Sequence, residues 1–263
     1  LRHTQKHIPR QEKFMKEIIS EKLREIERRE NVKILHCVES GSRAWGFASP
    51  DSDYDVRFIY VRPKEFYLRL DKTRDVIEWQ LDETLDINGW DVQKALQLLY
   101  RSNPTVFEWN ASPIVYETTA AWKEISAVID RYFVQKTGLY HYLSTAKRNY
   151  KEFLTGEKVK LKRYFYVLRP LLACKWILSE GTPPPMLFSA LAEKFLDEEI
   201  RPDVEKLLEL KINAPEIAEG APFENVNRYL EKTMTDLEER ILSLPDRHMQ
   251  NWDELHRIFL NLL

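Results

Sequence analysis

The sequence is short of the residues on which several common classes of site depend. Among its 263 residues there are only two cysteines and six histidines, and they do not stand at spacings typical of a zinc site. Cys37 and Cys174 both lie inside apolar segments, which favours reduced core thiols over a disulfide framework. The chain also carries no signature of a Ser-His-Asp nucleophile.

Long apolar runs and a large excess of one charge are missing too. No apolar stretch reaches the length needed to cross a bilayer, and the first residues lack a signal-peptide core. We therefore expect a cytoplasmic protein that does not contact membranes. Forty basic and 42 acidic side chains give a net charge of -2, so a nucleic-acid-binding surface, where one exists, must be local.

The remaining composition is that of a folded protein of mixed structure. Hydrophobic residues make up 43% of the chain, enough for a real core in one large or two modest domains. Short runs rich in β-branched and aromatic residues occur in the first part, and nearly everything beyond Glu117 has helical spacing punctuated by Gly or Pro. We predict an α+β fold with a boundary between residues 1–116 and 117–263.

Several local features support element assignments. Apolar residues at helical spacing predict an amphipathic helix from about Gln11 to Glu30. Asp91 is suited to cap a helix that runs through Tyr100. The segment Lys64 to Asp75 is either a helix or a loop. Pro170 should kink the helix that contains it or split it in two.

The most informative stretch runs from Gly41 to Asp55, between two short strand-like runs. Gly41 permits close approach of the backbone to a ligand, and Ser42 offers a hydroxyl and a cap to the following turn. Asp53 and Asp55 stand two apart at the start of a strand, so the strand period predicts that both carboxylates share one face. A Gly-Ser turn that can hold phosphate, beside carboxylates that can hold magnesium, indicates a site for a metal-bound nucleoside triphosphate.

A third carboxylate extends this pattern. Asp86 lies between the apolar residues Leu85 and Ile87, so it is either an exposed edge-strand residue or a partner for Asp53 and Asp55. An EF-hand loop starting at Asp51 is excluded, because its sixth and twelfth positions hold Val and Arg where that loop needs Gly and Glu. An Asp-rich turn without chemistry stays possible for the Asp-x-Asp motif alone.

The segment from Lys147 to Lys175 is unusually basic. Nine basic residues stand against two acidic ones, a local charge of about +7 in a nearly neutral chain. Lys162, Tyr166 and Arg169 fall on one helical face, which predicts an anion-binding surface opposite the carboxylates. An ordinary solvated face is the alternative, and a rotated helix would instead turn Lys160 and Arg163 inward.

These motifs together resemble the polymerase-β nucleotidyltransferase superfamily. Within it, Glu39 to Phe47, Ser49 to Arg57 and Asp86 to Asp91 are similar to the predicted nucleotidyltransferases associated with RNA ligases, the RlaP/YcgL group. Lys162 to Ala173 continues the likeness, which covers roughly residues 15 to 190.

The resemblance implies a fold and a set of roles. Residues 1–116 would form a mixed sheet with helices, and residues 117–263 an all-helical domain that closes over the nucleotide and acceptor. Gly41 and Ser42 would bind the β and γ phosphates of a nucleoside triphosphate. The metal ligands and catalytic residues would be Asp53, Asp55 and Asp86, which together hold two magnesium ions.

The predicted reaction moves a nucleoside monophosphate to an acceptor hydroxyl. An RNA end is the first choice of acceptor, because the group is linked to RNA ligases and the basic segment is interleaved with aromatic residues. A protein side chain or a small molecule is the alternative acceptor. A catalytically idle nucleotide- or RNA-binding module is a further alternative, disfavoured by the intact set of three carboxylates.

Overall fold

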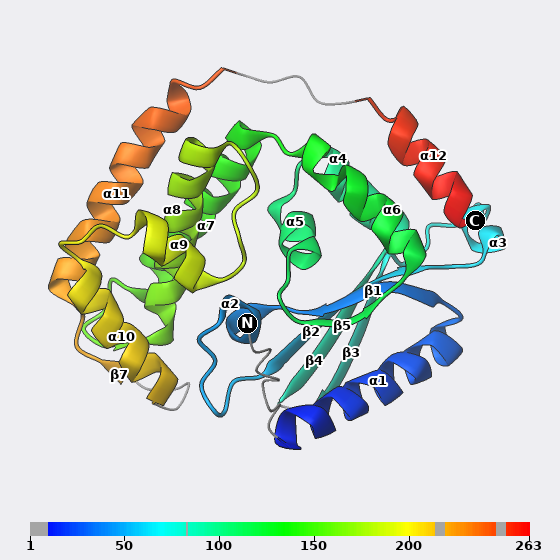
Figure 1. Ribbon diagram of the computed structural model, residues 1–263, viewed down its shortest axis with the longest axis horizontal. Coiled ribbons are helices and arrows are strands. Elements are labelled where there is room, and N and C mark those ends of the chain that lie inside the picture. The colour runs from blue at the N-terminus through cyan, green and yellow to red at the C-terminus, as the bar shows by residue number, and fades with distance from the viewer. Residues whose placement is uncertain (1–9, 83, 214–218, 246–250) are drawn as a thin grey trace, which may run out of the picture.

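The fold is a mixed five-stranded sheet followed by helices (Figure 1). The computed structural model describes residues 10–82, 84–213, 219–245 and 251–263. The sheet has the order β3-β4-β2-β1-β5, with strands β1 (Lys33–Glu39), β2 (Tyr54–Val61), β3 (Val76–Asp82), β4 (Leu85–Asp91) and β5 (Val115–Thr118). β2 and β4 run parallel, and the other neighbours pair antiparallel. The α+β class and the mixed sheet predicted above are therefore confirmed.

Helices cover both faces of this sheet and form most of the second half. They are α1 (Arg10–Glu30), α2 (Gly41–Trp45), α3 (Lys64–Tyr67), α4 (Val92–Tyr100), α5 (Pro104–Asn110), α6 (Ala120–Ile129), α7 (Gln135–Phe153), α8 (Lys162–Glu180), α9 (Phe188–Phe195), α10 (Arg201–Asn213), α11 (Glu224–Leu242) and α12 (Asp253–Leu262). No helix among the described residues combines the length and the apolar character that crossing a bilayer requires.

Two hydrophobic clusters hold the sheet, one on each face. On the first, Ile19, Leu23 and Ile26 of α1 are buried with side chains of the strands that include Phe58, which confirms the predicted amphipathic helix. On the second, α4, α5 and α6 pack in the larger cluster that continues into the helical half. The sheet is thus a layer between α1 on one face and α4, α5 and α6 on the other, as Figure 1 shows.

The helical half contains one small exception to the predicted all-helical structure. The two-residue strands β6 (Val159–Lys160) and β7 (Glu219–Gly220) pair antiparallel. Of the two outcomes predicted for Pro170, a kink or a split, the split is excluded, because α8 runs unbroken from Lys162 to Glu180 with Pro170 inside it. Proline removes one helix hydrogen bond and crowds the carbonyl four residues before it, and the dense packing around α8, which buries Pro170 itself, offsets that cost.

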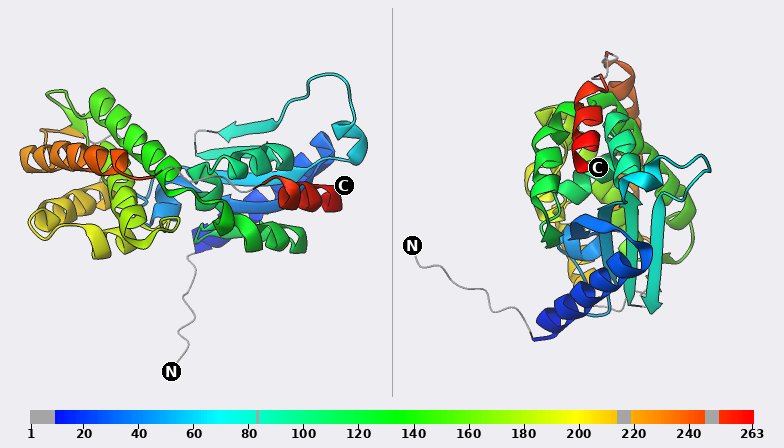
Figure 2. Two further views of the ribbon diagram at one scale, coloured as in Figure 1. Left: turned by 90° about the horizontal axis from the view of Figure 1, so that it is seen from above. Right: turned by 90° about the vertical axis from the view of Figure 1, so that its right-hand side faces the viewer.

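The two halves lie side by side and share packing at their joint (Figure 2). Phe47, just after α2, contacts the rings of Phe165 in α8 and Phe188 in α9, at centroid distances of 4.8 and 5.6 Å. The boundary proposed between residues 116 and 117 falls inside β5. The helix α12 returns from the end of the chain to the sheet half, where Phe259 packs on Tyr67.

Local capping explains where α4 and α5 begin. The Asp91 side chain accepts a hydrogen bond from the Gln93 amide at 2.8 Å, as the sequence predicted. Asn103 caps α5 in the same way and places Pro104 in its first turn. Asp91 also accepts a hydrogen bond from the Tyr67 hydroxyl at 3.0 Å, and burial raises the pKa of this carboxyl.

Replacing Asp91 with alanine should lower the free energy of unfolding by about 1–3 kcal/mol, because a buried cap and a buried acceptor are lost together. Asp91→Asn keeps an acceptor for the Gln93 amide and should retain most of the stability. Urea unfolding of both variants measures the difference. If the alanine variant were as stable as the asparagine one, the cap would not be what holds the start of α4.

Candidate active site

Two of the predicted carboxylates lie side by side on adjacent strands. In the parallel pairing of β2 with β4, Asp55 is directly opposite Asp86. Directly opposed residues of neighbouring strands project their side chains from the same face of the sheet. On β4, Asp86 is exposed while Leu85 and Ile87 are buried, as the alternation of the sequence predicted. The fold thus brings together two acidic residues that are 31 positions apart.

A cation already lies between these two carboxylates. The Arg57 Nη2 atom is 2.9 Å from Asp55 Oδ1 and 2.8 Å from Asp86 Oδ2. Arg57 Nη1 donates to the backbone carbonyls of Asp86 and Val56, both at 3.1 Å. Arg57 was not among the predicted site residues, although its position two residues after Asp55 on one strand places it on the same face.

The donor chemistry of this arrangement suits magnesium. Carboxylate oxygens are the hard ligands that Mg²⁺ prefers, and the guanidinium shows that positive charge is accommodated between Asp55 and Asp86. Within the described part of the chain, no three His, Cys, Asp or Glu side chains converge closely enough to hold a metal ion as they stand. The carboxylates are therefore placed on one surface but held by Arg57.

Asp53, the third predicted carboxylate, is exposed and lies one residue before β2. Its backbone is fixed by Arg43, whose Nε donates to the Asp53 carbonyl at 3.1 Å and whose Nη2 donates to the Ser52 carbonyl at 2.8 Å. The Arg43 guanidinium also lies over the Tyr54 ring, 3.7 Å from its centroid. Arg43 therefore braces the loop that carries Asp53.

The same loop is held from the helical half. Lys211 of α10 is 3% exposed, and its Nζ donates to Ser49 Oγ at 2.9 Å and to Ser52 Oγ at 3.4 Å. Both serines are buried, and their hydroxyls lie 2.9 Å apart. Because Lys211 belongs to the second half of the chain, the position of the loop before Asp53 depends on how the two halves pack.

The Gly-Ser turn lies directly against Asp55. The Ser40 amide donates to the Asp55 carbonyl at 2.8 Å, and Gly41 has a φ of +58°. A Cβ atom on Gly41 would lie 2.0 Å from Asp55 Oδ2. A side chain at Gly41 would therefore displace the Asp55 carboxylate even when no ligand is bound. The expectation that Ser42 caps the helix is wrong, since α2 begins at Gly41 and Ser40 occupies the cap position.

A buried acid next to this turn was not among the predicted site residues. Glu39 is fully buried; its carboxylate accepts from the Asp55 amide at 2.7 Å and from the Tyr116 hydroxyl. Burial raises the pKa of Glu39 to about 7. Through the Asp55 amide, Glu39 fixes the backbone of the strand at the position where Asp55 projects. Its place at the end of an apolar strand was the available signal.

The predicted residues of α8 approach the same turn through an aromatic side chain. The Tyr166 ring packs edge-on against Trp45 of α2 at 5.3 Å, and the Arg169 guanidinium lies 4.9 Å from the Trp45 ring. The Arg163 guanidinium lies over Phe153 at 3.7 Å and also over the Tyr166 ring at 5.3 Å. Tyr166 and Arg169 therefore share the face that is directed at α2, and Lys162 lies half-exposed at the start of the helix.

Arg169 is more deeply buried than a residue that only attracts ligands. It is 2% exposed, with Nη1 at 2.8 Å from Glu108 Oε1 and Nε donating to the Met186 carbonyl at 3.2 Å. The Arg169 Nη2 and Trp45 Nε1 atoms are buried and have no hydrogen-bond acceptor among the described residues. The Arg169 guanidinium thus packs against the Trp45 ring and fixes its position, and its Nη2 donor has no acceptor among the described residues.

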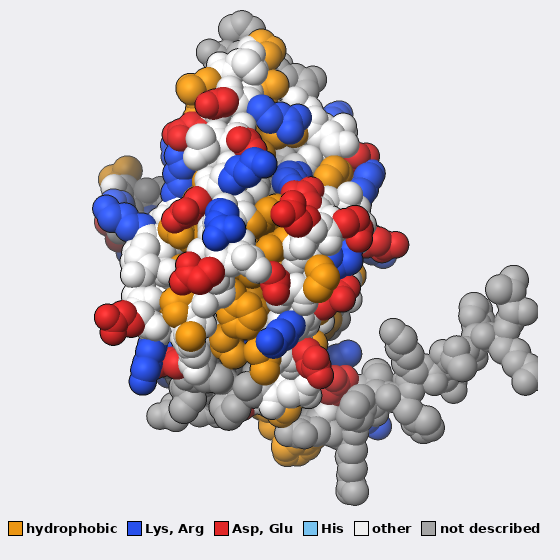
Figure 3. Space-filling model, turned by 90° about the vertical axis from the view of Figure 1, so that its left-hand side faces the viewer, with side chains coloured by type: hydrophobic (Ala, Val, Ile, Leu, Met, Phe, Trp, Pro, Cys, Tyr) orange, Lys and Arg blue, Asp and Glu red, His pale blue; other side chains and the backbone are white. Residues whose placement is uncertain are grey.

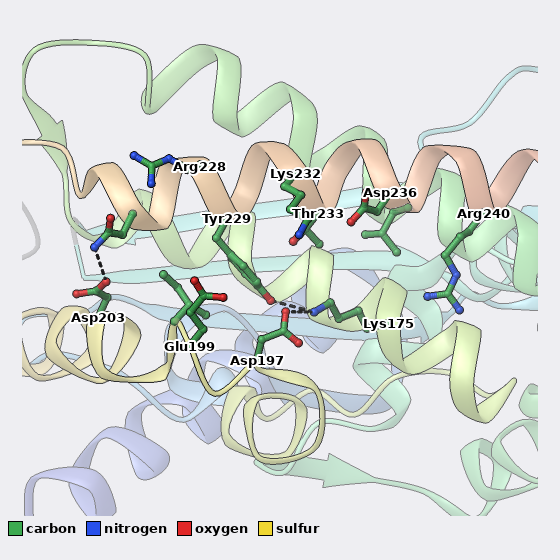
Figure 4. A pocket seen from close by; sticks show the side chains of 13 residues that line it. Lys175, Asp197, Glu199, Asp203, Arg228, Tyr229, Lys232, Thr233, Asp236 and Arg240 are labelled. Carbon is green, nitrogen blue, oxygen red and sulfur yellow. Dashed lines mark hydrogen bonds and ion pairs between the residues drawn. The ribbon is translucent and has the colours of Figure 1, made fainter.

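A separate cavity lies in the helical half, away from the carboxylates (Figure 4). Its volume is about 730 Å³, and it is bordered by α11 and by the segment from Asp197 to Asp203. Lys175 points into it and bonds the Tyr229 hydroxyl and Asp197. Its lining has four basic and four acidic side chains: Lys175, Arg228, Lys232 and Arg240 against Asp197, Glu199, Asp203 and Asp236. Equal numbers of each sign select no class of charged ligand.

Replacing Gly41 with alanine should destabilise the fold more than the same change at Gly46, the other positive-φ glycine beside α2. Both changes force alanine into left-handed backbone, which costs about 1–2 kcal/mol. Only at Gly41 does the new Cβ overlap a carboxylate; at Gly46 its nearest neighbour is Leu187 Cδ2 at 3.1 Å. Thermal unfolding compares the variants, and equal losses would show that Asp55 moves aside without cost.

Comparison with solved structures gives a distant match. A crystal structure of a nucleotidyltransferase-like protein from Exiguobacterium sibiricum matches with 14% identity and a TM-score of 0.31, over 84% of this chain and 73% of that one. That likeness is too slight to carry an argument.

Sequence similarity is far stronger. An uncharacterized protein of Bacillus subtilis, YcgL, is 43% identical over 249 residues, which span 94% of this chain and 96% of that protein. The model of the RlaP family, described as an RNA repair pathway DNA polymerase beta family, matches residues 15–261. Because that match includes the sheet, the carboxylates and nearly all of the helical half, the chain belongs to the RNA repair pathway DNA polymerase beta family.

Proposed function

We propose that the chain is a magnesium-dependent nucleotidyltransferase that moves a nucleoside monophosphate from a nucleoside triphosphate to an acceptor hydroxyl. The observation that carries this proposal is the juxtaposition of Asp55 and Asp86 on parallel neighbouring strands, with the Gly41 backbone against Asp55. Membership of a polymerase beta family supports the same class of reaction.

In this proposal the carboxylates of Asp53, Asp55 and Asp86 hold two magnesium ions. Such ions would supply a Lewis acid for the acceptor hydroxyl and neutralise the charge of the leaving group. The acceptor oxygen forms a bond to the α-phosphorus while the bond from that phosphorus to the bridging oxygen breaks, so pyrophosphate leaves and the hydroxyl proton passes to solvent water. The chain's part is to position these groups, and no protein nucleophile is required.

The turn and α8 serve the triphosphate in this scheme. The backbone at Gly41 and the hydroxyl of Ser42 bind the phosphates, because amide donors on a glycine turn can approach them closely. Lys162 supplies charge at the half-exposed start of α8, and Tyr166 offers a ring beside Trp45. Arg169 positions Trp45 from its buried site and contributes its unpaired Nη2.

An RNA end is the proposed acceptor, and a functional link to an RNA ligase follows from it. Its main support is the family, whose description places it in RNA repair. The basic segment gives less support than its sequence suggested, since Lys147, Arg169 and Lys175 form ion pairs with acidic residues outside it. On the face of the helical half in Figure 3, basic and acidic side chains are interspersed.

The position of the label in the triphosphate tests the reaction directly. The chain is incubated with magnesium and each triphosphate, labelled on either the α or the γ phosphate, together with RNA of defined ends or with a protein mixture. Transfer of α label and release of γ label as pyrophosphate is the expected result. Transfer of γ label would instead indicate a kinase, and α label on protein would replace RNA as the acceptor.

Asp53→Asn, Asp55→Asn and Asp86→Asn should each abolish transfer of the α label. Stability should change by no more than about 1 kcal/mol in each, because Asp53 is exposed and the ion pairs of Arg57 with Asp55 and Asp86 are partly exposed. Asp71→Asn, on an exposed loop with its partner Arg69, removes the same charge and should stay fully active. An active Asp86→Asn enzyme would show that Asp86 is not required for catalysis.

Lys162→Ala should lower the turnover number at saturating acceptor by a factor of about 100 to 1,000, the usual loss when one donor to a developing charge is removed. That loss should persist at high salt. Lys151→Ala, an exposed change on α7, should instead raise the acceptor KM at low salt only. Steady-state kinetics at two salt concentrations separates the two, and a normal turnover number in Lys162→Ala would place Lys162 outside the site.

A further inference from the structure

The position of Arg57 bears on how the carboxylates of Asp55 and Asp86 would acquire a metal ion. A single nitrogen of its guanidinium contacts both carboxylates, at 2.9 and 2.8 Å, and the Arg57 side chain is 18% exposed. Two carboxylates on adjacent strands repel each other until a cation arrives. Arg57 supplies that cation from within the chain, so the pair is stable without a metal.

The same contacts oppose metal binding. A magnesium ion needs oxygen ligands at about 2.0–2.1 Å in nearly ideal geometry, and a guanidinium between those ligands repels it. Asp55 has a second constraint, because its Oδ2 lies where a side chain on Gly41 would stand. No three acidic, His or Cys side chains in the described chain converge into a ready metal site. Arg57 must therefore leave the carboxylates before they can close on an ion.

We propose that Arg57 competes with the metal for Asp55 and Asp86, and that the triphosphate receives the guanidinium when the metal enters. This inference rests on the proposed function. The planar fork of arginine fits phosphate as well as carboxylate. The two bonds from Nη1 to the carbonyls of Val56 and Asp86 keep the side chain beside the site during the exchange.

The exchange makes metal and triphosphate bind as a pair. A free metal ion has to displace Arg57 without compensation, whereas with a triphosphate the displaced guanidinium gains a new partner. Each ligand therefore raises the affinity for the other by the same factor, since coupling between two binding equilibria is reciprocal. The site therefore binds the metal-nucleotide complex in preference to a free metal ion.

Manganese binding to the whole chain, measured by calorimetry without nucleotide, tests the competition. Arg57→Gln should bind Mn²⁺ about tenfold more tightly than the unaltered chain, the value of one favourable charge-assisted pair. Arg62→Gln is the matched control, because Arg62 follows the same strand, carries the same charge and pairs with Glu30 instead. Its Mn²⁺ affinity should be unchanged. Equal or weaker binding by Arg57→Gln, or equal tightening by Arg62→Gln, overturns the proposal.

Arg57→Lys provides a second variant that keeps the charge. A lysine ammonium lacks the fork needed to bridge two carboxylates while bonding two carbonyls, so Mn²⁺ should bind this variant more tightly than the unaltered chain and less tightly than Arg57→Gln. Affinity as weak as that of the unaltered chain would count against the bridge. If Arg57→Gln did not fold, Arg57→Lys alone would decide between these outcomes.

Coupling to nucleotide gives an independent readout. With a non-hydrolysable triphosphate present, Mn²⁺ affinity should rise in the unaltered chain and rise much less in Arg57→Gln, and an equal rise in both would overturn the exchange. Asp55→Asn and Asp86→Asn separate this inference from the proposed function. If neither change weakens Mn²⁺ binding, the metal site and the proposed function fail together; if both do and Arg57→Gln does not tighten binding, only this inference fails.

Discussion

The parallel pairing of β2 with β4 is the constraint on which the site depends. In a sheet whose other pairs are antiparallel, it sets Asp55 opposite Asp86. A shift of one residue would turn Asp86 toward the core and expose Ile87, because side chains alternate between the faces of a strand. Ile87 is fully buried, so the hydrophobic core enforces the register that brings the two carboxylates together. Burial on one face thus determines chemistry on the other.

The helical half reaches this site mainly through packing. Phe47 and Trp45, on either side of Gly46, contact rings and a guanidinium from α8. Arg169 supports Trp45 from a buried position and is itself tied to Glu108 of α5. The turn against Asp55 is therefore held between a strand and a helix that are far apart in the sequence. A change in the packing of α8 would therefore shift this turn and, through it, the position of Asp55.

Features that depend on adjacent residues were predicted well from the sequence. Features that depend on contacts between distant parts of the chain were not. The Asp91 cap and the exposure of Asp86 between buried neighbours each depend on a few adjacent residues. Continuity through Pro170 does not, since it depends on packing contributed by other helices. The boundary proposed at residue 116 likewise could not take distant contacts into account: α12, at the far end of the sequence, packs against the sheet half.

The roles of site residues followed the same division. Strand period could place the carboxylates on one face, but a single sequence does not show which cation or acid lies beside them. Glu39 and Arg57 acquire their partners from Tyr116 and Asp86, through strand pairings that a local pattern does not encode. The sum of about +7 over the basic segment also counted charges without their distant acidic partners, such as Glu238 for Lys147. The net charge summed over a segment of sequence can thus exceed the net charge of the surface that the segment forms, because acidic partners from elsewhere in the chain are left out of the sum.

Carboxylates that lie close together in a folded protein need compensating charge or hydrogen-bond donors, and the acidic residues of this site have both. Each uncompensated carboxylate would raise the free energy of the folded state by repulsion and, where buried, by lost hydration. Asp55 and Asp86 share Arg57, which keeps their charge near the surface balanced. Glu39 is buried, and there burial raises the pKa to about 7 while Tyr116 and the Asp55 amide donate to it. The partly exposed pair is thus balanced by a side-chain cation and the buried acid by hydrogen-bond donors, and in the proposed exchange only the side-chain cation is open to replacement by a ligand.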